Sequence, residues 1–172
     1  GKETEWHIIA NSSASCFQAI AALLPRRATW PLKRRNAMQF EGIYTPVVTP
    51  YHDDFSLNRP ALEATIEHLI TAGVHGLIIA GTTGEYYAQS MDERIEMMTI
   101  AKEIISGRAP MIIGTGAIRT EDSVIYAEAA RNIGADALLI ATPPYAYPTG
   151  REIALHALAI DRAANLRSLI HL

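Results

Sequence analysis

Short apolar runs of strand length alternate with segments of helical period along most of this sequence. The apolar runs lie at residues 43–48, 77–80, 111–113, 137–141 and 168–172. They are continuously apolar, which is typical of strands in a parallel sheet that is buried on both faces. The alternation therefore predicts an α/β fold with right-handed crossovers.

Two of these units repeat each other closely. Residues 73–80 and 134–141 share a helix-ending glycine, a short loop and an apolar strand in the same register. A doubly wound sheet and a (β/α)8 barrel both contain such units, but the G-x-G-x-x-G fingerprint of the dinucleotide-binding sheet is absent. Polar or glycine-rich residues follow the first four strands, as they do in barrel enzymes. The pattern favours a partial (β/α)8 TIM barrel, with about five strands and four helices of eight each.

Local signals mark where the helices of this series begin. The predicted starts are Asn58 followed by Pro60, the capping boxes Ser90-x-x-Glu93 and Thr149-x-x-Glu152, and Thr120 as the cap of the third helix. In the first helix, Leu62, Ile66 and Leu69 have the spacing of a buried stripe. We expect each helix to pack against the sheet through such a stripe.

Composition excludes several classes of protein. With 49% hydrophobic and 19% charged residues, and no apolar run near the ~20 residues of a membrane span, the sequence predicts a soluble globular domain. Cys16 is the single cysteine, and the six histidines show no metal-ligand spacing. We therefore expect a cytoplasmic protein without a metal site or membrane contact.

Residues 1–37 differ in charge from the rest of the chain. They hold six basic and two acidic residues, whereas the whole sequence has a net charge of −3. Arg26 and Arg27 follow an apolar run, the reverse of the order in a secretory signal. An import peptide and nucleic-acid contact through Arg34 and Arg35 are alternatives. We expect 1–37 to be a flexible amino-terminal extension with no nucleic-acid partner, and 38–172 to form the barrel part.

A loop rich in glycine and hydroxyl groups follows the second strand. Gly81-Thr82-Thr83-Gly84-Glu85 comes directly after the apolar run at 77–80. Glycines let a backbone approach a ligand closely, and consecutive N–H groups with two hydroxyls can surround a carboxylate or a phosphate. The loop therefore predicts a site for a small anion.

Three further motifs accompany this loop in order along the chain. They are residues 42–50, Gly114-Thr115-Gly116, and Thr142-Pro143-Pro144-Tyr145. Together, from about Phe40 to Leu172, they resemble the dihydrodipicolinate synthase and N-acetylneuraminate lyase family of class I pyruvate-dependent aldolases. The resemblance implies a (β/α)8 barrel, usually a homotetramer, in which a lysine forms a Schiff base with pyruvate or a related 2-oxo acid. No metal or organic cofactor is implied.

The resemblance also implies roles for individual residues. Thr83 would bind the substrate carboxylate together with the backbone around Gly81 and Gly84. Thr82 would supply a hydroxyl of a proton relay, and Tyr145 would be the relay tyrosine that reaches a neighbouring subunit's site. From the residues alone, the threonines could also form a plain turn, and Tyr145 could be a packed aromatic at the rim.

The lysine that this chemistry needs is not evident. The sequence contains only Lys2, Lys33 and Lys102, and none follows a predicted strand. The family's lysine lies on the sixth strand, so the resemblance implies that residues 38–172 are the amino-terminal half of an aldolase. The lysine and a second tyrosine would lie beyond Leu172, and this chain alone would be inactive. A non-catalytic half-barrel or pseudoenzyme, and a phosphate-binding barrel, are the alternatives.

The second substrate is left open by the sequence. The Thr82-Thr83 pair resembles the loop of the synthases, but Tyr86-Tyr87 departs from the small residues common in lysine-biosynthesis members. Semialdehyde, aldehyde and sugar-acid partners are all compatible with the motifs. Tyr147 is an alternative to Tyr145 as the relay tyrosine.

Overall fold

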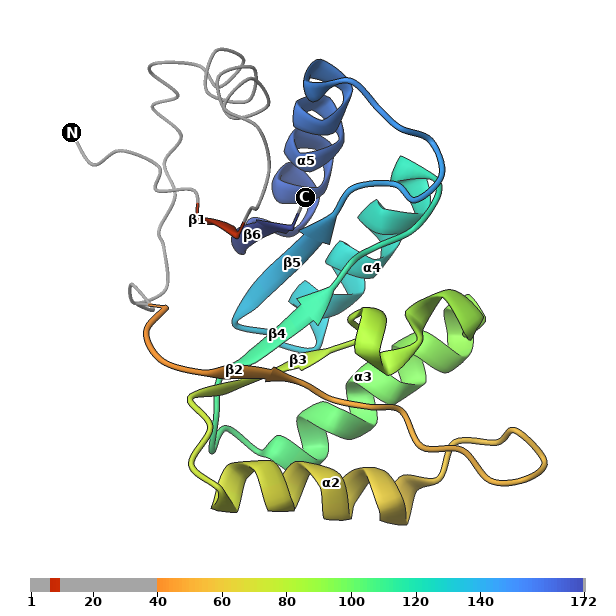
Figure 1. Ribbon diagram of the computed structural model, residues 1–172, viewed down its shortest axis with the longest axis vertical. Coiled ribbons are helices and arrows are strands. Elements are labelled where there is room, and N and C mark those ends of the chain that lie inside the picture. The colour runs from red at the N-terminus through yellow and green to blue at the C-terminus, as the bar shows by residue number, and fades with distance from the viewer. Residues whose placement is uncertain (1–6, 10–39, 172) are drawn as a thin grey trace.

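One parallel sheet organises the computed structural model, which describes residues 7–9 and 40–171 (Figure 1). The strands are β1 (His7–Ile9), β2 (Tyr44–Pro46), β3 (Gly76–Ile79), β4 (Met111–Gly114), β5 (Ala137–Ala141) and β6 (Arg167–His171). The helices are α2 (Arg59–Thr71), α3 (Met91–Ile105), α4 (Thr120–Asn132) and α5 (Gly150–Ala164), with short 3-10 turns at η1 (Thr82–Gly84) and η2 (Tyr86–Ala88). The strand order is β1-β6-β5-β4-β3-β2. The five strands and four helices expected after residue 40 are thus confirmed.

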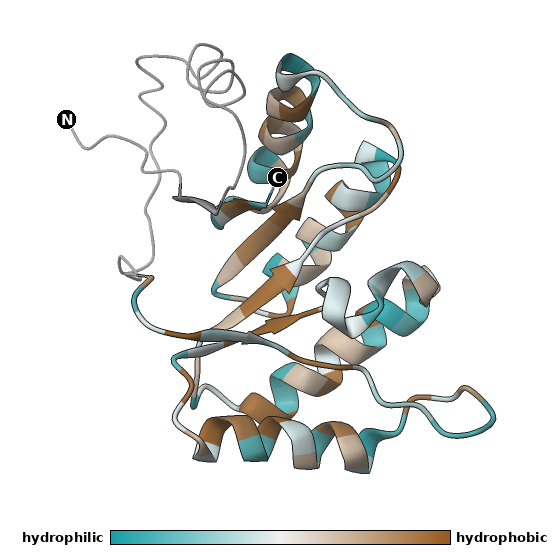
Figure 2. Ribbon diagram, viewed as in Figure 1, coloured by the Kyte–Doolittle hydropathy of each residue, from teal (hydrophilic) through white to brown (hydrophobic). Residues whose placement is uncertain are grey.

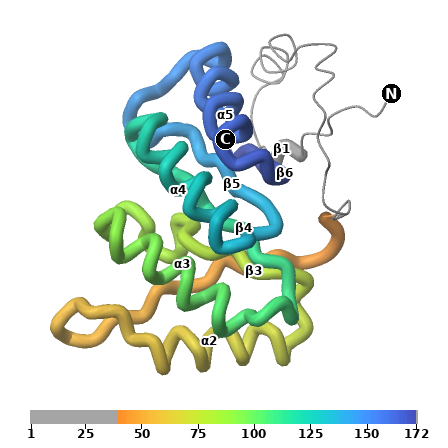
Figure 3. Tube along the Cα trace, turned by 180° about the vertical axis from the view of Figure 1, so that it is seen from behind, coloured from red at the N-terminus to blue at the C-terminus, as the bar shows by residue number. Residues whose placement is uncertain are grey.

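The helices α2 to α5 lie along one face of the sheet only (Figures 1 and 3). On the helix side, Ile113 and Leu138 are fully buried in the main hydrophobic core. On the other face, Ile112 and Leu169 form a smaller cluster with Phe40 packed against it. A doubly wound sheet carries helices on both faces, whereas a barrel wall carries them on its outer face. The described part of the chain therefore has the arrangement of a barrel wall.

The strand register decides which side chains share a face. Ile78 pairs with Ile112, and Ile112 pairs with Ala137, so these three residues lie on the face away from the helices. Apolar colour is continuous along β3, β4 and β5, while the helices carry both kinds of residue (Figure 2). Because all the strands are parallel, the loops that follow them leave the sheet at one edge.

The helices begin at three of the four predicted positions. The Asn58 side chain accepts a hydrogen bond from the backbone N–H of Ala61 at 3.0 Å. Both capping boxes form, with Ser90 paired to Glu93 before α3 and Thr149 paired to Glu152 before α5. These contacts involve residues three apart, which is why local sequence patterns reveal them.

The prediction that Thr120 caps α4 is wrong. Arg119 occupies the capping position without a side-chain hydrogen bond, and Thr120 is the first residue of the helix. The Thr120 hydroxyl lies 2.9 Å from Nδ1 of His156 in α5. A partner 36 residues away therefore takes the hydroxyl that would otherwise cap the helix.

One strand was not predicted. Residues 7–9 fall in the segment expected to be a flexible extension, and they pair in parallel with 169–171 at the edge of β6. The remaining residues of 1–37 lie outside the described part of the chain. Three residues are too few for a period-two or apolar-run signal, so sequence reasoning had no basis for this strand.

The buried helix-side core makes a stability prediction. Leu138→Ala should lower the free energy of unfolding by about 2–5 kcal/mol, because Leu138 is 0% exposed between β5 and the helices. Urea denaturation followed by circular dichroism measures this change. Leu155→Ala is the matched control, since Leu155 is 52% exposed on α5 and should change the free energy by no more than ~0.5 kcal/mol. Equal losses in the two variants would contradict the assigned packing.

Candidate active site

Two glycine-containing loops meet at the carboxyl edge of the sheet. Residues 81–85 follow β3, and Gly114 ends the neighbouring strand β4. A Cβ placed on Gly114 would lie 2.3 Å from the carbonyl oxygen of Ala80. Only glycine allows this close approach, so the two loops lie side by side at this edge.

The first loop is a tight turn that presents its two threonines to solvent. Gly84 N–H donates to the Gly81 carbonyl and Glu85 N–H to the Thr82 carbonyl, both at 3.0 Å. Gly81 and Gly84 are buried, whereas Thr82 and Thr83 are exposed. The N–H groups of both threonines stand at the start of the 3-10 turn, and among the described residues they have no hydrogen-bond acceptor. The loop therefore offers both hydroxyls and two backbone donors at the sheet edge.

Strained residues flank this turn. Ala80 and Glu85 have φ angles of 57° and 54°, in the left-handed region that side chains other than glycine rarely adopt. Such strain costs about 1–3 kcal/mol per residue and is concentrated at functional sites. The backbone here is held in one shape by its surroundings.

The base of the turn is anchored to β2 and its following segment. Thr49 donates from its hydroxyl to the Gly84 carbonyl at 2.8 Å. Gln89 donates in turn to Thr49 at 3.3 Å and to the Tyr51 hydroxyl at 2.9 Å. These bonds fix the base of the loop and do not involve the Thr83 side chain.

A buried arginine joins the ends of β3 and β4. The Arg94 side chain, from α3, is 1% exposed and donates to the carbonyls of Gly114 at 2.5 Å and Gly116 at 2.7 Å. Burial lowers its pKa to about 10. Sequence reasoning missed this residue. The available signal was that Arg94 has the helical spacing of the buried residues Met98 and Ile105 and therefore shares their face of α3.

The two tyrosines proposed for the relay stand apart from this loop. Tyr145 and Tyr147 follow β5 and are 95% and 94% exposed. Within residues 40–171, neither forms a hydrogen bond or ring contact with another side chain. The structure thus places both tyrosines on the same edge of the sheet as Thr82 but brings neither into contact with it.

The one described lysine lies at the other edge of the sheet. Lys102 donates from Nζ to the Gly134 carbonyl at 2.6 Å, and Gly134 precedes β5. Thr82 follows the carboxyl end of β3, so the length of the sheet separates the two residues. Lys102 is therefore not positioned to attack a ligand held by the threonine turn.

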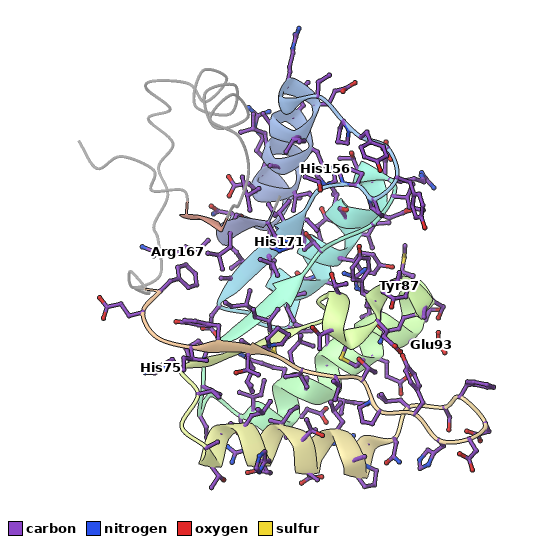
Figure 4. The ribbon with its side chains drawn as sticks, viewed as in Figure 1. His75, Tyr87, Glu93, His156, Arg167 and His171 are labelled. Carbon is purple, nitrogen blue, oxygen red and sulfur yellow. The ribbon has the colours of Figure 1, made fainter. Side chains whose placement is uncertain are left out.

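His156 is a buried histidine near the carboxyl edge of the sheet, the edge at which the threonine turn lies (Figure 4). It is 5% exposed, its Nδ1 bonds the Thr120 hydroxyl, and its Nε2 has no partner of good geometry among the described residues. Burial lowers its pKa, and the nearby Ala141 carbonyl opposes that shift. The sequence shows only that the histidines lack metal-ligand spacing, and it gives no sign that one of them is buried with an unpartnered Nε2.

A pocket of about 280 Å³ lies beside the anchor of the loop. Its lining includes Thr49, Tyr51, Gln89 and Glu93, but neither of the threonines at 82 and 83. The exposed hydroxyls are therefore not part of this pocket. Among the described residues, no cluster of three metal-binding side chains occurs, and no helix has the length and apolarity to cross a membrane.

The fold and the loops define a class: one wall of a (β/α)8 barrel with a hydroxyl-bearing turn at the carboxyl edge of its sheet. Residues 39–171 match the dihydrodipicolinate synthetase family, and the chain belongs to that family. The sequence is 38% identical over 130 residues to a 4-hydroxy-tetrahydrodipicolinate synthase of Limosilactobacillus fermentum, covering 75% of this chain and 42% of the relative. It is 39% identical over 132 residues to the same enzyme of a Chelativorans species, covering 77% and 45%.

Solved structures of similar proteins superpose on the same part of this chain. A prophage protein of the dihydrodipicolinic acid synthase family from E. coli K12, in complex with pyruvate, superposes with a TM-score of 0.75 at 28% identity, over 77% of this chain and 45% of that one. CdNal from Clostridium difficile, in complex with mannosamine, has a TM-score of 0.75 at 26% identity, over 78% and 47%. The chain thus spans less than half the length of these relatives, and its sheet corresponds to part of a TIM barrel.

The buried histidine makes the stability of the fold depend on pH. Because burial lowers the folded-state pKa of His156 below its ordinary value of 6.5, the unfolded chain binds a proton more readily than the folded chain. The contribution of neutral His156 to the free energy of unfolding is fully present above pH 6.5. It is lost as the pH falls from there toward the lowered pKa. Urea unfolding between about pH 7.5 and 5 should therefore show less of this decline in His156→Gln.

The exposed His68 on α2 supplies the control for this experiment. His68→Gln should keep the pH dependence of the wild-type chain, because its side chain is exposed. An unchanged decline in His156→Gln would show that other groups cause it.

Proposed function

We propose that this chain is the amino-terminal half of a Schiff-base-forming lyase that acts on pyruvate or a related 2-oxo acid, similar to dihydrodipicolinate synthase. The observation that carries the proposal is the exposed Thr82-Thr83 turn, which lies beside Gly114 at the carboxyl edge of the sheet. Active sites of TIM-barrel enzymes lie at this edge. The family membership and the relative in complex with pyruvate support the same activity.

The turn suits the carboxylate of a 2-oxo acid. A carboxylate leaving water must have its lone pairs matched by donors, and the Thr83 hydroxyl with the free N–H groups of Thr82 and Thr83 supplies them. Gly81 and Gly84 permit the close backbone approach. These donor groups are themselves uncharged, and they are already placed where the negative charge of the acid would lie.

Proton transfer is the role that we propose for Thr82 and Tyr145. Hydroxyl groups can pass protons along a chain because each is both a donor and an acceptor. Tyr145 projects from an exposed loop, which suits a side chain that completes the site of a neighbouring subunit. The parent enzyme would then be a homotetramer, located in the cytoplasm, and would need neither a metal nor an organic cofactor.

The nucleophile is proposed to come from outside the printed residues. A Schiff-base lysine must be desolvated enough to lose its proton near neutral pH. Lys102 is hydrogen-bonded at the opposite edge of the sheet, and Lys2 and Lys33 lie in residues 1–37, proposed to be an extension. We propose that 38–172 is half of the aldolase domain and that a lysine beyond it completes the site.

A non-catalytic half-barrel or pseudoenzyme is the second candidate, and the position of Lys102 favours it over an enzyme complete in itself. The nucleotide sequence after the codon for Leu172 distinguishes the two, because an aldolase requires a strand-borne lysine there. The second substrate is a semialdehyde, an aldehyde or a sugar acid. Relatives named as 4-hydroxy-tetrahydrodipicolinate synthase and as N-acetylneuraminate lyase support different members of that set.

The proposal predicts the outcome of borohydride trapping with pyruvate. The 172-residue chain should give no reduced adduct on Lys102, because that amine is held at the Gly134 carbonyl, away from the turn. Mass spectrometry of proteolytic peptides makes the measurement. A chain extended through the next strand-borne lysine should give one adduct there, and the same extended chain with arginine in that position is the control. A stoichiometric adduct on Lys102 would refute the divided site.

Carboxylate binding by the turn can be tested without turnover. Thr83→Val should weaken pyruvate binding about tenfold, since a hydrogen bond to a charged group contributes about 1.5–3 kcal/mol. Amide chemical shifts of the 81–85 loop, followed in a pyruvate titration, report the affinity. Thr71→Val, an exposed position at the end of α2, is the control and should bind as the wild type does. Equal affinity in both variants would remove Thr83 from the site.

A further inference from the structure

Arg94 stands directly beneath the two loops of the candidate site. Its guanidinium lies 4.7 Å from the ring centre of Tyr86 and 3.9 Å from that of Tyr126. A Cβ on Gly116 would lie 2.8 Å from the Tyr86 ring, so the absence of a side chain there lets Tyr86 cover the arginine. Both aromatic rings attract the cation and limit the orientation of the guanidinium plane.

The hydrogen bonds of Arg94 determine which way neighbouring peptide groups point. Its Nη2 donates to the Ala80 carbonyl at 3.5 Å and its Nη1 donates to the Gly116 carbonyl at 2.7 Å. In a trans peptide the C=O and N–H bonds point in opposite directions. The N–H groups of Gly81 and Ala117, which share these peptides, therefore point away from the arginine, and neither has an acceptor within residues 40–171.

The peptide between Gly114 and Thr115 shows directly that the C=O and N–H groups point in opposite directions. Arg94 binds the carbonyl of Gly114 at 2.5 Å, and the N–H of the same peptide, on Thr115, donates to the Leu139 carbonyl at 3.0 Å. One guanidinium thus ties the end of β4 to the end of β3, while the opposite side of the same peptide bonds β5. The relative position of the loops after β3 and β4 depends on this side chain.

The positive charge of Arg94 is not neutralised nearby. Its hydrogen bonds to the strand ends go to carbonyls, and no carboxylate among the described residues forms an ion pair with it. With a pKa of about 10, it is protonated at neutral pH. A buried cation of this kind, surrounded by dipoles alone, leaves a positive potential where the loops end.

We propose that Arg94 is a positioning residue for the carboxylate of the 2-oxo acid. It clamps the ends of β3 and β4 into one anion site, turns the N–H groups of Gly81 and Ala117 away from itself, and supplies the positive potential that the turn lacks. The inference rests on the proposed function, which assigns the carboxylate to this edge. It adds a cation to a site otherwise made of neutral donors.

The test compares a charged ligand with a neutral one. Pyruvate and its uncharged amide, pyruvamide, are titrated into the wild-type chain and into Arg94→Lys and Arg94→Gln, with loop amide shifts as the readout. Arg94→Gln should weaken pyruvate binding about tenfold more than pyruvamide binding, because only pyruvate carries the charge. Arg94→Lys keeps the charge but loses the planar fork, so it should weaken both ligands to a similar extent. A purely structural role would instead predict equal losses of both ligands in Arg94→Gln.

Controls separate the possible failures. Arg59→Gln removes an exposed arginine that pairs with Glu103, and it should bind both ligands as the wild type does. If wild-type loop amides do not shift with pyruvate, the carboxylate site and this inference both fail. If they shift and Arg94→Gln binds pyruvate equally well, only the inference fails. If Arg94→Gln does not fold, as judged by circular dichroism, Arg94→Lys becomes the test. Unchanged affinity of Arg94→Lys for both ligands would then contradict the proposal that Arg94 holds the ends of β3 and β4 in one anion site.

Discussion

Burial of one sheet face beneath α2 to α5 is the constraint on which the rest of the structure depends. The helix-side residues Ile113 and Leu138 are fully buried, and a shift of one residue in the pairing of β4 with β5 would turn one of them to the other face. The hydrophobic pattern therefore fixes the register as well as the fold. Once the register is fixed, the ends of β3 and β4 must lie side by side, and the loops after them must form one surface.

The same helix serves the core and the candidate site. On α3, Met98 and Ile105 are buried against the sheet, and Arg94, one turn before Met98, reaches the strand ends. A long side chain with a rigid, planar head can extend from a packed helix to two neighbouring strands at once. The shape of the exposed threonine turn is thus determined by core packing as much as by its own glycines.

Much of the fold was predictable because the signals are local. Continuous apolar runs located β3 to β6 to within a residue or two, and the pairs Ser90–Glu93 and Thr149–Glu152 located helix starts. The contacts that sequence reasoning missed join distant residues: Thr120 with His156, and Arg94 with carbonyls at least 14 residues away. No pattern in a single sequence encodes such pairs, because they depend on how the helices pack. The positions of the site loops were predictable, while the side chain that joins them was not.

The pairing of β1 with β6 has a consequence for the order of folding. Residues 7–9 pair with residues 169–171, so almost the whole of the 172-residue sequence lies between the two partners. Contacts of such high sequence separation form slowly, because a long loop must close before any of the pairing energy is gained. The strands from β2 to β5, each paired to its neighbour in sequence, can assemble before that. β1 therefore has no partner until β6 has been made, and it then joins a sheet whose other strands can already have paired with one another.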